Sequence, residues 1–301
     1  MNLIVPFFLL APLVLVPLAF RLLDAASPGF GPPPRAVSLV FPAGILLTVS
    51  FDLPAGPPAA LLAAPWLVVA GWVALEAGLR LLQDPARFRP GPRLVTGAAV
   101  AFLAAGATFA FVGRLGVDLF GFPPEMTLLA AVHFHFAGFV LPLAGALAYR
   151  RRQARALAIA LAAVVLGIPL TAIGFFDLPL ANWTGAMLTA TGGFVIGVST
   201  FILAGGLQTL GARSLARIAG LCLLVSMPMA VIHAIGVFVG AAWLDVATMA
   251  RIHGGLNSLG FGLAAMLAWT LERRSTTHRA GIPADQRPRS AAETGAVEAS
   301  R

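Results

Sequence analysis

Residues 128–152 read LLAAVHFHFAGFVLPLAGALAYRRR, and they indicate both the class of protein and its chemistry. From Leu128 to Tyr149 there is no Asp, Glu, Lys or Arg, and three arginines follow directly. A helix of about 20 apolar residues spans the hydrocarbon core of a bilayer, which is roughly 30 Å thick. The stretch therefore predicts a membrane-spanning helix that ends at a charged boundary. Its two histidines, His133 and His135, need polar partners, because an unpaired imidazole in lipid is costly.

The rest of the chain repeats this apolar pattern. Of 301 residues, 59% are hydrophobic and 11% are charged, and the mean hydropathy is +0.90. A soluble domain cannot bury so much apolar surface. We therefore predict an all-α, polytopic transmembrane helix bundle over residues 1–272, followed by a disordered cytoplasmic tail, residues 273–301. Breaks at proline, glycine and charged residues divide the bundle into nine expected spans: 2–22, 36–52, 58–82, 93–113, 126–149, 154–176, 182–208, 214–241 and 246–271.

The charged residues orient these spans. All 20 basic residues are arginine, and the formal net charge is +8. With the N-terminus outside and the C-terminus in the cytoplasm, 18 of the 20 lie on the cytoplasmic side, and only Arg114 and Arg251 lie outside. This asymmetry is that of the positive-inside rule. The clustering of arginines in short loops favours membrane lipid as the partner and no nucleic acid, and it leaves the oligomeric state open.

Four histidines lie within the expected spans: His133 and His135 in the fifth, His233 in the eighth and His253 in the ninth. Each lies 15 to 19 residues from the charged residue at the cytoplasmic end of its span. At about 1.5 Å per residue, all four lie about 22–29 Å above that boundary, in the outer third of the bilayer. Hydrogen bonding across helices can explain a single membrane histidine. Four at one level predict a shared site.

The spacing of His133 and His135 limits what they can do together. Positions two apart on an α-helix differ by about 200°, so the two side chains point to nearly opposite sides. They cannot hold one ion together without distorting the helix. Either they serve two centres that flank the helix, or one is a ligand and the other makes a structural hydrogen bond.

The ninth expected span adds a fifth candidate. In RIHGGLNSLGFG, residues 251–262, Asn257 follows His253 by four positions and shares its helix face. The glycines of this stretch leave the helix narrow, so that a neighbouring helix or a flat ligand can come close. Asn257 therefore joins the four histidines as a candidate cofactor-binding residue.

The segment AVHFHFAGF, residues 131–139, resembles the HFHY-type segment of haem–copper oxidase subunit I. In that family, two histidines at this spacing ligate two haems on opposite faces of one helix. The resemblance covers nine residues only. The chain has no adjacent pair of histidines, and its one tyrosine, Tyr149, lies at the other end of the helix. We therefore do not expect proton-pumping oxygen reduction.

A wider resemblance is to the YndJ-like family of bacterial integral membrane proteins. It rests on AVHFHFAGFVLPL, residues 131–143, and ARIHGGLNSLGFGLA, residues 250–264, and the size and layout of the spanning region are similar. The resemblance implies a multi-pass protein of the bacterial inner (cytoplasmic) membrane. It implies no particular chemistry.

The residues favour an integral membrane protein with a histidine-rich haem- or metal-binding site in the outer third of the bilayer. Imidazole ligates haem iron, zinc and copper alike. His133, His135, His233 and His253 are the candidate ligands, and haem or a transition metal (zinc or copper) is the expected cofactor. Redox chemistry, sensing and cofactor handling are all roles for such a site.

Two other functions remain open. The first is an intramembrane zinc-dependent lipid hydrolase, in which three histidines leave a position for an activated water. This chemistry needs a nearby acid, and Glu125 and Asp177 are the only plausible acids, although neither lies on a well-placed helix. The second is a transporter or structural membrane protein whose histidines relay protons. Whether the protein is an enzyme is left open by the sequence.

Overall fold

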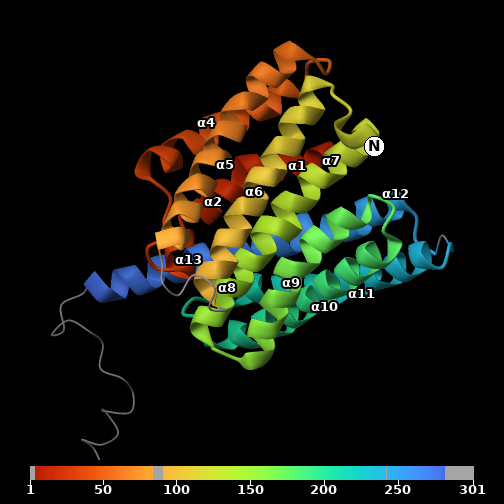
Figure 1. Cartoon of the computed structure of the whole chain (residues 1–301). Coiled ribbons are helices and arrows are strands. Elements are labelled where there is room, and N and C mark those ends of the chain that lie inside the picture. The colour runs from red at the N-terminus through yellow and green to blue at the C-terminus, as the bar shows by residue number, and fades with distance from the viewer. Residues whose placement is uncertain (1–3, 84–90, 242, 282–301) are drawn as a thin grey trace, which may run out of the picture.

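The protein is helical over the nine segments that the sequence predicts to span the membrane (Figure 1). The computed structural model describes residues 4–83, 91–241 and 243–281. Within these residues, seven helical segments are long and apolar enough to cross a membrane, and two others, Ile4–Phe20 and Pro34–Ser50, are shorter. The all-α, polytopic transmembrane fold is thus confirmed. The seven long segments are Pro57–Gln83, Pro92–Leu115, Pro124–Arg151, Arg155–Gly174, Pro179–Gly206, Leu210–Phe238 and Val246–Thr276.

The N-terminal half of the chain contains four apolar helical segments before the histidine-bearing span. Several of its helices begin at a proline, which suits the first turn because a helix leaves that N–H unpaired. α6 ends at Gly116, whose φ of +77° is the left-handed conformation that closes many helices. The elements are α1 (Ile4–Leu10), η1 (Ala11–Leu15), α2 (Val16–Phe20), α3 (Leu23–Ala26), α4 (Pro34–Ser50), α5 (Pro57–Gln83), α6 (Pro92–Leu115) and η2 (Leu119–Gly121).

The C-terminal half begins with the histidine-bearing span and ends in a long helix. That last helix starts at a capped turn, where the Asp245 carboxylate accepts the Thr248 N–H at 2.6 Å; this bond lowers the pKa of Asp245. The elements are α7 (Pro124–His133), η3 (Phe134–Val140), α8 (Leu141–Arg151), α9 (Arg155–Gly174), α10 (Pro179–Leu203), η4 (Ala204–Gly206), α11 (Leu210–Phe238), α12 (Val246–Thr248), η5 (Met249–His253), η6 (Leu256–Leu263) and α13 (Ala264–Gly281).

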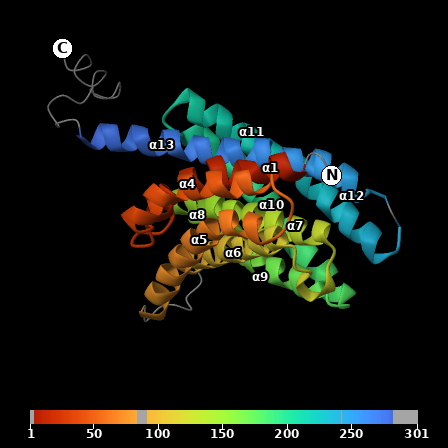
Figure 2. The same cartoon turned by 90° about the horizontal axis from the view of Figure 1, so that it is seen from above.

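The span formed by α7, η3 and α8 lies at the centre of the bundle. It contacts α6, α9 and α10, and it also contacts the first and the last helices of the chain. Of its most apolar window, 67% is buried, the highest value among the seven long spans. Figure 2 shows α1 alongside the last helix, so the two ends of the spanning region close the bundle together. The two histidines of the opening stretch therefore lie on the most enclosed helix.

Four stretches of the described chain are π-helical, namely η1, η3, η5 and η6. A π-turn closes its hydrogen bond over five residues instead of four, widens the helix, and is common at functional sites. η1, η3 and η6 pack against one another. A Cβ on Gly262 would lie 3.1 Å from Leu15 Cδ1 and 3.6 Å from Phe136 Cδ1, so this glycine lets the three segments meet. The stretches that carry the family resemblance, 131–143 and 250–264, are both interrupted in this way.

α9 and α10 are held together by glycines at their contact face. A Cβ on Gly185 would lie 2.6 Å from the Gly167 carbonyl oxygen, and one on Gly192 would lie 2.6 Å from the Ala160 carbonyl oxygen. Close approach of backbones through small residues is a main source of helix association in membranes. Gly192, on the seventh expected span, thus serves helix packing.

Gly185→Leu is therefore expected to destabilise the protein by about 1–3 kcal/mol, because the side chain would have to separate the two helices. Gly71→Leu in α5 is the matched control, since nothing lies within 4 Å of a Cβ at that position. Thermal unfolding in detergent would compare the two variants. Equal unfolding temperatures for both would contradict this account of the contact face.

The end of the last helix differs from the boundary drawn from the sequence. α13 continues to Gly281, nine residues past residue 272, the expected end of the bundle. Residues 282–301, the rest of the segment predicted to be disordered, lie outside the described residues.

Candidate functional site

His135 is buried where the central span packs against α1, α5 and α6, and both of its ring nitrogens are hydrogen-bonded. Its Nδ1 lies 2.7 Å from the Ala131 carbonyl oxygen, which can only accept, so Nδ1 carries the hydrogen. The Trp66 indole N–H donates to Nε2 over 3.1 Å. The imidazole is fully enclosed, at 0% exposure. With no lone pair left, His135 makes a structural contact in this structure and is not placed to bind a ligand.

Three other helices shape this histidine's surroundings. The Trp66 ring of α5 stacks on the imidazole at a centroid distance of 5.8 Å, and Phe8 of α1 meets it edge-on at 5.2 Å. On α6, a Cβ at Gly106 would lie 2.6 Å from His135 Nδ1, so only glycine leaves room for the ring. His135 thus joins α1, α5 and α6 to the central span.

His133 turns to the other side of the same helix. Its side chain is exposed, and it has no hydrogen bond to another described residue. A positive charge on His133 would be repelled by one on His253, so the two side chains lie within electrostatic range of each other. The two histidines of the H-x-H stretch therefore lie in different surroundings: His135 is enclosed and hydrogen-bonded, and His133 is exposed.

His253 belongs to a small polar network between α11 and the last helix. Its Nδ1 donates to the Ser226 carbonyl oxygen at 2.9 Å. Asn257 holds this network together, because its Nδ2 donates to the His253 carbonyl oxygen at 2.7 Å and its Oδ1 accepts from Ser226 Oγ at 3.2 Å. Both ends of the Asn257 amide are thus engaged within the protein, and Asn257 supports the backbone of His253.

His233 lies near the end of α11, and its imidazole is hydrogen-bonded in the same way as that of His253. Its Nδ1 donates to the Leu244 carbonyl oxygen at 2.8 Å, across the turn that leads into the last helix. In both histidines the Nε2 atom keeps its lone pair, and neither Nε2 has a hydrogen-bond partner among the described residues. Both are half-buried.

Of the four predicted ligands, His133, His233 and His253 lie within electrostatic range along one series, and His135 lies apart from them. His253 interacts electrostatically with both His133 and His233, whereas His135 faces Trp66. Within residues 4–83, 91–241 and 243–281, no three His, Cys, Asp or Glu side chains are close enough to hold a metal ion together. His133, His253 and His233 form a row of imidazoles, which we call the histidine row, and not a closed ligand set.

The glycines of the ninth span lie against neighbouring side chains. A Cβ on Gly255 would lie 3.5 Å from the Phe7 ring, and one on Gly260 would lie 3.0 Å from Cys222 Cβ. The narrow face of this helix is thus used by α1 and α11, two protein neighbours.

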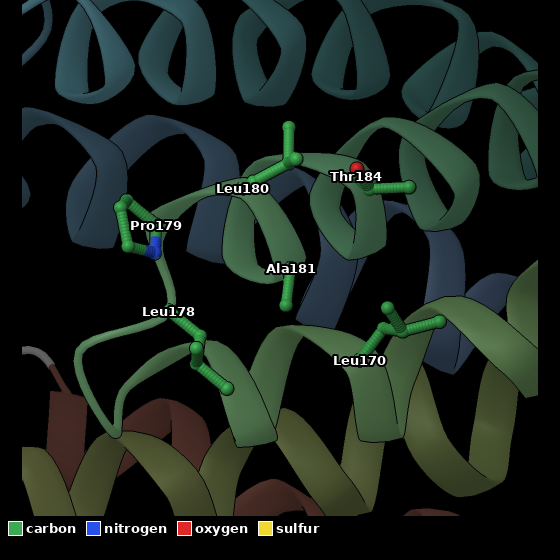
Figure 3. A pocket seen from close by; sticks show the side chains of 6 residues that line it. All are labelled: Leu170, Leu178, Pro179, Leu180, Ala181 and Thr184. Atoms are coloured by element: carbon green, nitrogen blue, oxygen red, sulfur yellow. The ribbon is translucent and has the colours of Figure 1, made fainter.

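An apolar pocket of about 470 Å³ lies at the start of α10 (Figure 3). It is lined by Leu170, Leu178, Pro179, Leu180, Ala181 and Thr184, and Thr184 supplies the one hydroxyl. None of the histidines contributes to it. Its lining suits an acyl chain and offers no group for catalysis or metal binding.

Two partners of the histidines were missed by the reasoning from sequence. Trp66 lies in the middle of the expected third span, whereas tryptophans of membrane proteins gather at the interfaces. That unusual depth is a signal that its indole N–H has a polar partner. The carbonyl of Ser226 offers no such signal, since any residue has a carbonyl. Pro228 lies two residues after Ser226, inside α11.

Comparison with known proteins links the chain to one family. The family model described as YndJ-like protein matches residues 7–261. The uncharacterized membrane protein YndJ of Bacillus subtilis (strain 168) is 26% identical over 184 residues, which are 57% of this chain and 31% of that protein. The chain therefore spans about a third of the length of this curated relative. No solved structure matches the chain.

Proposed function

This chain belongs to the YndJ-like family of membrane proteins, and we propose that it binds a transition-metal ion at the histidine row. The protein would lie in the bacterial cytoplasmic membrane with its N-terminus outside. The site would then face the outer leaflet. Zinc and copper are the metals that imidazole ligands suit.

This proposal rests on the hydrogen bonds that His233 and His253 make. Each donates Nδ1–H to a backbone carbonyl, which leaves Nε2 as the acceptor atom. Metal-binding histidines almost always hold their other ring nitrogen in this manner, which sets the tautomer and orients the ring. A histidine that only joins helices uses its nitrogens on protein partners, as His135 does.

His133 is the third imidazole of the row, and it would have to move closer to the other two for all three to hold one ion, because no three such side chains are close enough among the described residues. It lies within electrostatic range of His253 and is not held by a hydrogen bond to any described residue, so its ring can rotate without breaking a contact. Neutral imidazoles can ligate a bound cation through a ring-nitrogen lone pair. His135 and Asn257 have supporting roles in this proposal, the first through Trp66 and the second through the His253 backbone.

A metal ion is favoured over haem and over hydrolysis. A haem needs a flat cleft between helices, whereas the glycine faces beside the histidines are occupied by Phe7 and Cys222. Hydrolysis needs an acid or base beside the activated water. Neither Glu125 nor Asp177 makes a hydrogen bond or ion pair with the row among the described residues. Holding or handling an ion at the outer face is the role that these residues support.

The test is metal binding by the full chain, purified in detergent from cells grown with haem, zinc and copper available. We expect about one equivalent of zinc or copper by elemental analysis, and an affinity lowered on the order of 100-fold in His253→Ala. Calorimetric titration of the metal-stripped protein would measure this. His278→Ala, near the end of α13 and far along the chain from the row, is the control and should bind as the wild type does.

Three outcomes would contradict the proposal. Equal metal affinity in His253→Ala and wild type would remove the row from the site. A Soret band at stoichiometric intensity in the oxidised-minus-reduced spectrum would replace the metal ion by haem. Protein without metal or haem would leave proton relay or helix joining as the role of the histidines.

A further inference from the structure

The opposite end of the bundle carries a second feature, which the proposed metal site does not involve. Arg150, Arg151, Arg152 and Arg155 surround the turn between α8 and α9, and α11 and α13 bring further arginines to the same end. This is the end that the sequence predicts to be cytoplasmic. Only Glu272 among the acidic residues from position 126 to 281 belongs to it, because Asp177 and Asp245 lie in the loops at the other end.

One ion pair gathers these elements. Glu272 of α13 is 4% exposed and accepts from Arg151 at 2.5 Å and from the Gln208 backbone N–H at 2.8 Å. Arg151 also donates to the Gly206 carbonyl oxygen at 3.3 Å, and Arg213 Nε donates to the Leu207 carbonyl oxygen at 2.7 Å. The end of α8, the η4 turn and the starts or ends of α11 and α13 are therefore held side by side.

Several arginines near this ion pair have no ion pair of their own with the described residues. Glu272 is engaged by Arg151 and the Gln208 N–H, and it is buried. Five exposed arginines near it make no ion pair or hydrogen bond with another described residue: Arg150, Arg152, Arg155, Arg217 and Arg274. We call these five the arginine patch.

We propose that the arginine patch binds the phosphate of an anionic phospholipid headgroup. The patch lies where the charged ends of apolar helices α8, α9, α11 and α13 meet, which is the depth of headgroups in a bilayer. Guanidinium groups bind phosphate through two parallel hydrogen bonds and are more weakly hydrated than ammonium groups. Four helix ends that carry arginine, with no exposed carboxylate on these helices among the described residues, make a surface that attracts such lipids.

The experiment compares lipids on the full chain in detergent micelles. Native mass spectrometry would count bound dioleoylphosphatidylglycerol or dioleoylphosphatidylcholine, and unfolding temperature would be measured with each lipid. We expect the anionic lipid to bind and stabilise, the zwitterionic lipid to do neither at the same concentration, and inorganic phosphate to leave the unfolding temperature unchanged. Equal effects of the two lipids, or an equal effect of inorganic phosphate, would overturn the proposal.

The variant that tests the position is R150Q/R152Q/R155Q, which leaves Arg151 and its ion pair in place. A loss of about fivefold in affinity per arginine predicts a loss on the order of 100-fold for the triple variant. R287Q/R289Q/R301Q removes the same number of charges from the C-terminal segment and should keep the wild-type affinity. If the first triple binds the anionic lipid like the wild type, or the second loses as much, the patch is not the site.

A single substitution covers the case in which the triple variant does not fold. Arg152 lies in the extended turn after α8, with φ −143° and ψ 104°, and its side chain makes no contact that the helices need. Arg152→Gln should unfold at the wild-type temperature in phosphatidylcholine and bind phosphatidylglycerol about fivefold more weakly. Wild-type affinity in this variant would also overturn the proposal.

Discussion

His135→Ala is expected to lower the free energy of unfolding by about 3–5 kcal/mol. The substitution empties a fully enclosed space between α1, α5, α6 and the central span. It also leaves the Trp66 indole N–H without an acceptor in a buried position, since His135 Nε2 is the partner that it has. Unfolding of the purified protein by denaturant, followed by circular dichroism or tryptophan fluorescence, would measure the loss.

A double-mutant cycle separates the hydrogen bond from the packing. Trp66→Phe alone leaves His135 Nε2 unpaired, and His135→Leu alone leaves the indole N–H unpaired, so each carries the cost of one buried polar group. The double variant removes both groups, and its destabilisation should be smaller than the sum of the two single losses. Strict additivity would mean that the two rings share no hydrogen bond of consequence.

His135→Ala also distinguishes the role of His135 from that of His133. His135 is hydrogen-bonded to Trp66, whereas His133 lies within electrostatic range of His253. His135→Ala should therefore keep its metal affinity under conditions in which it remains folded. His133→Ala should show the reverse, with reduced metal affinity and nearly unchanged stability, because its side chain is exposed and unbonded to described residues. Parallel losses in both variants would contradict this division of roles.

Glu272→Ala is expected to destabilise the protein by about 2–4 kcal/mol. The buried carboxylate accepts from Arg151 and from the Gln208 N–H, and its removal leaves a guanidinium and a backbone donor without their partner. The Arg151 side chain is 37% exposed and can turn to water, which keeps the loss below that of a wholly buried pair. Thermal unfolding in detergent would measure it.

Glu76→Ala is the matched control for this ion pair. Glu76 pairs with Arg80 at 3.4 Å, but the two side chains are 39% and 35% exposed, and exposed pairs contribute about 0–1 kcal/mol. Arg80 also keeps its hydrogen bonds to the Gly29 and Gly31 carbonyls when Glu76 is removed. An effect of Glu76→Ala as large as that of Glu272→Ala would show that burial does not distinguish the two pairs.

Much of the architecture follows from local sequence. Each of the nine apolar segments is a helix, because a chain in lipid must satisfy its backbone hydrogen bonds within the segment. The divergence of His133 and His135 follows from helix geometry as well. The shared level of the histidines in the bilayer stays a prediction; His253 lies within electrostatic range of His133 and His233.

The partners of these side chains depend on contacts between distant segments. Trp66 and His135 are 69 residues apart in the chain, and Arg151 and Glu272 are 121 apart. The residues next to a histidine in the sequence do not show whether its Nε2 accepts an indole N–H or keeps a free lone pair.

The amino-acid sequence alone was thus sufficient for the helices and their apolar lengths, since hydrophobicity and helical rise act along the chain. Assembly of the bundle was needed to bring Trp66 to His135, to bury Glu272 against Arg151, and to leave the arginine patch without ion pairs to other described residues. These features depend on which atom lies within about 3 Å of another, and that distance is set only when helices from both halves of the chain pack together.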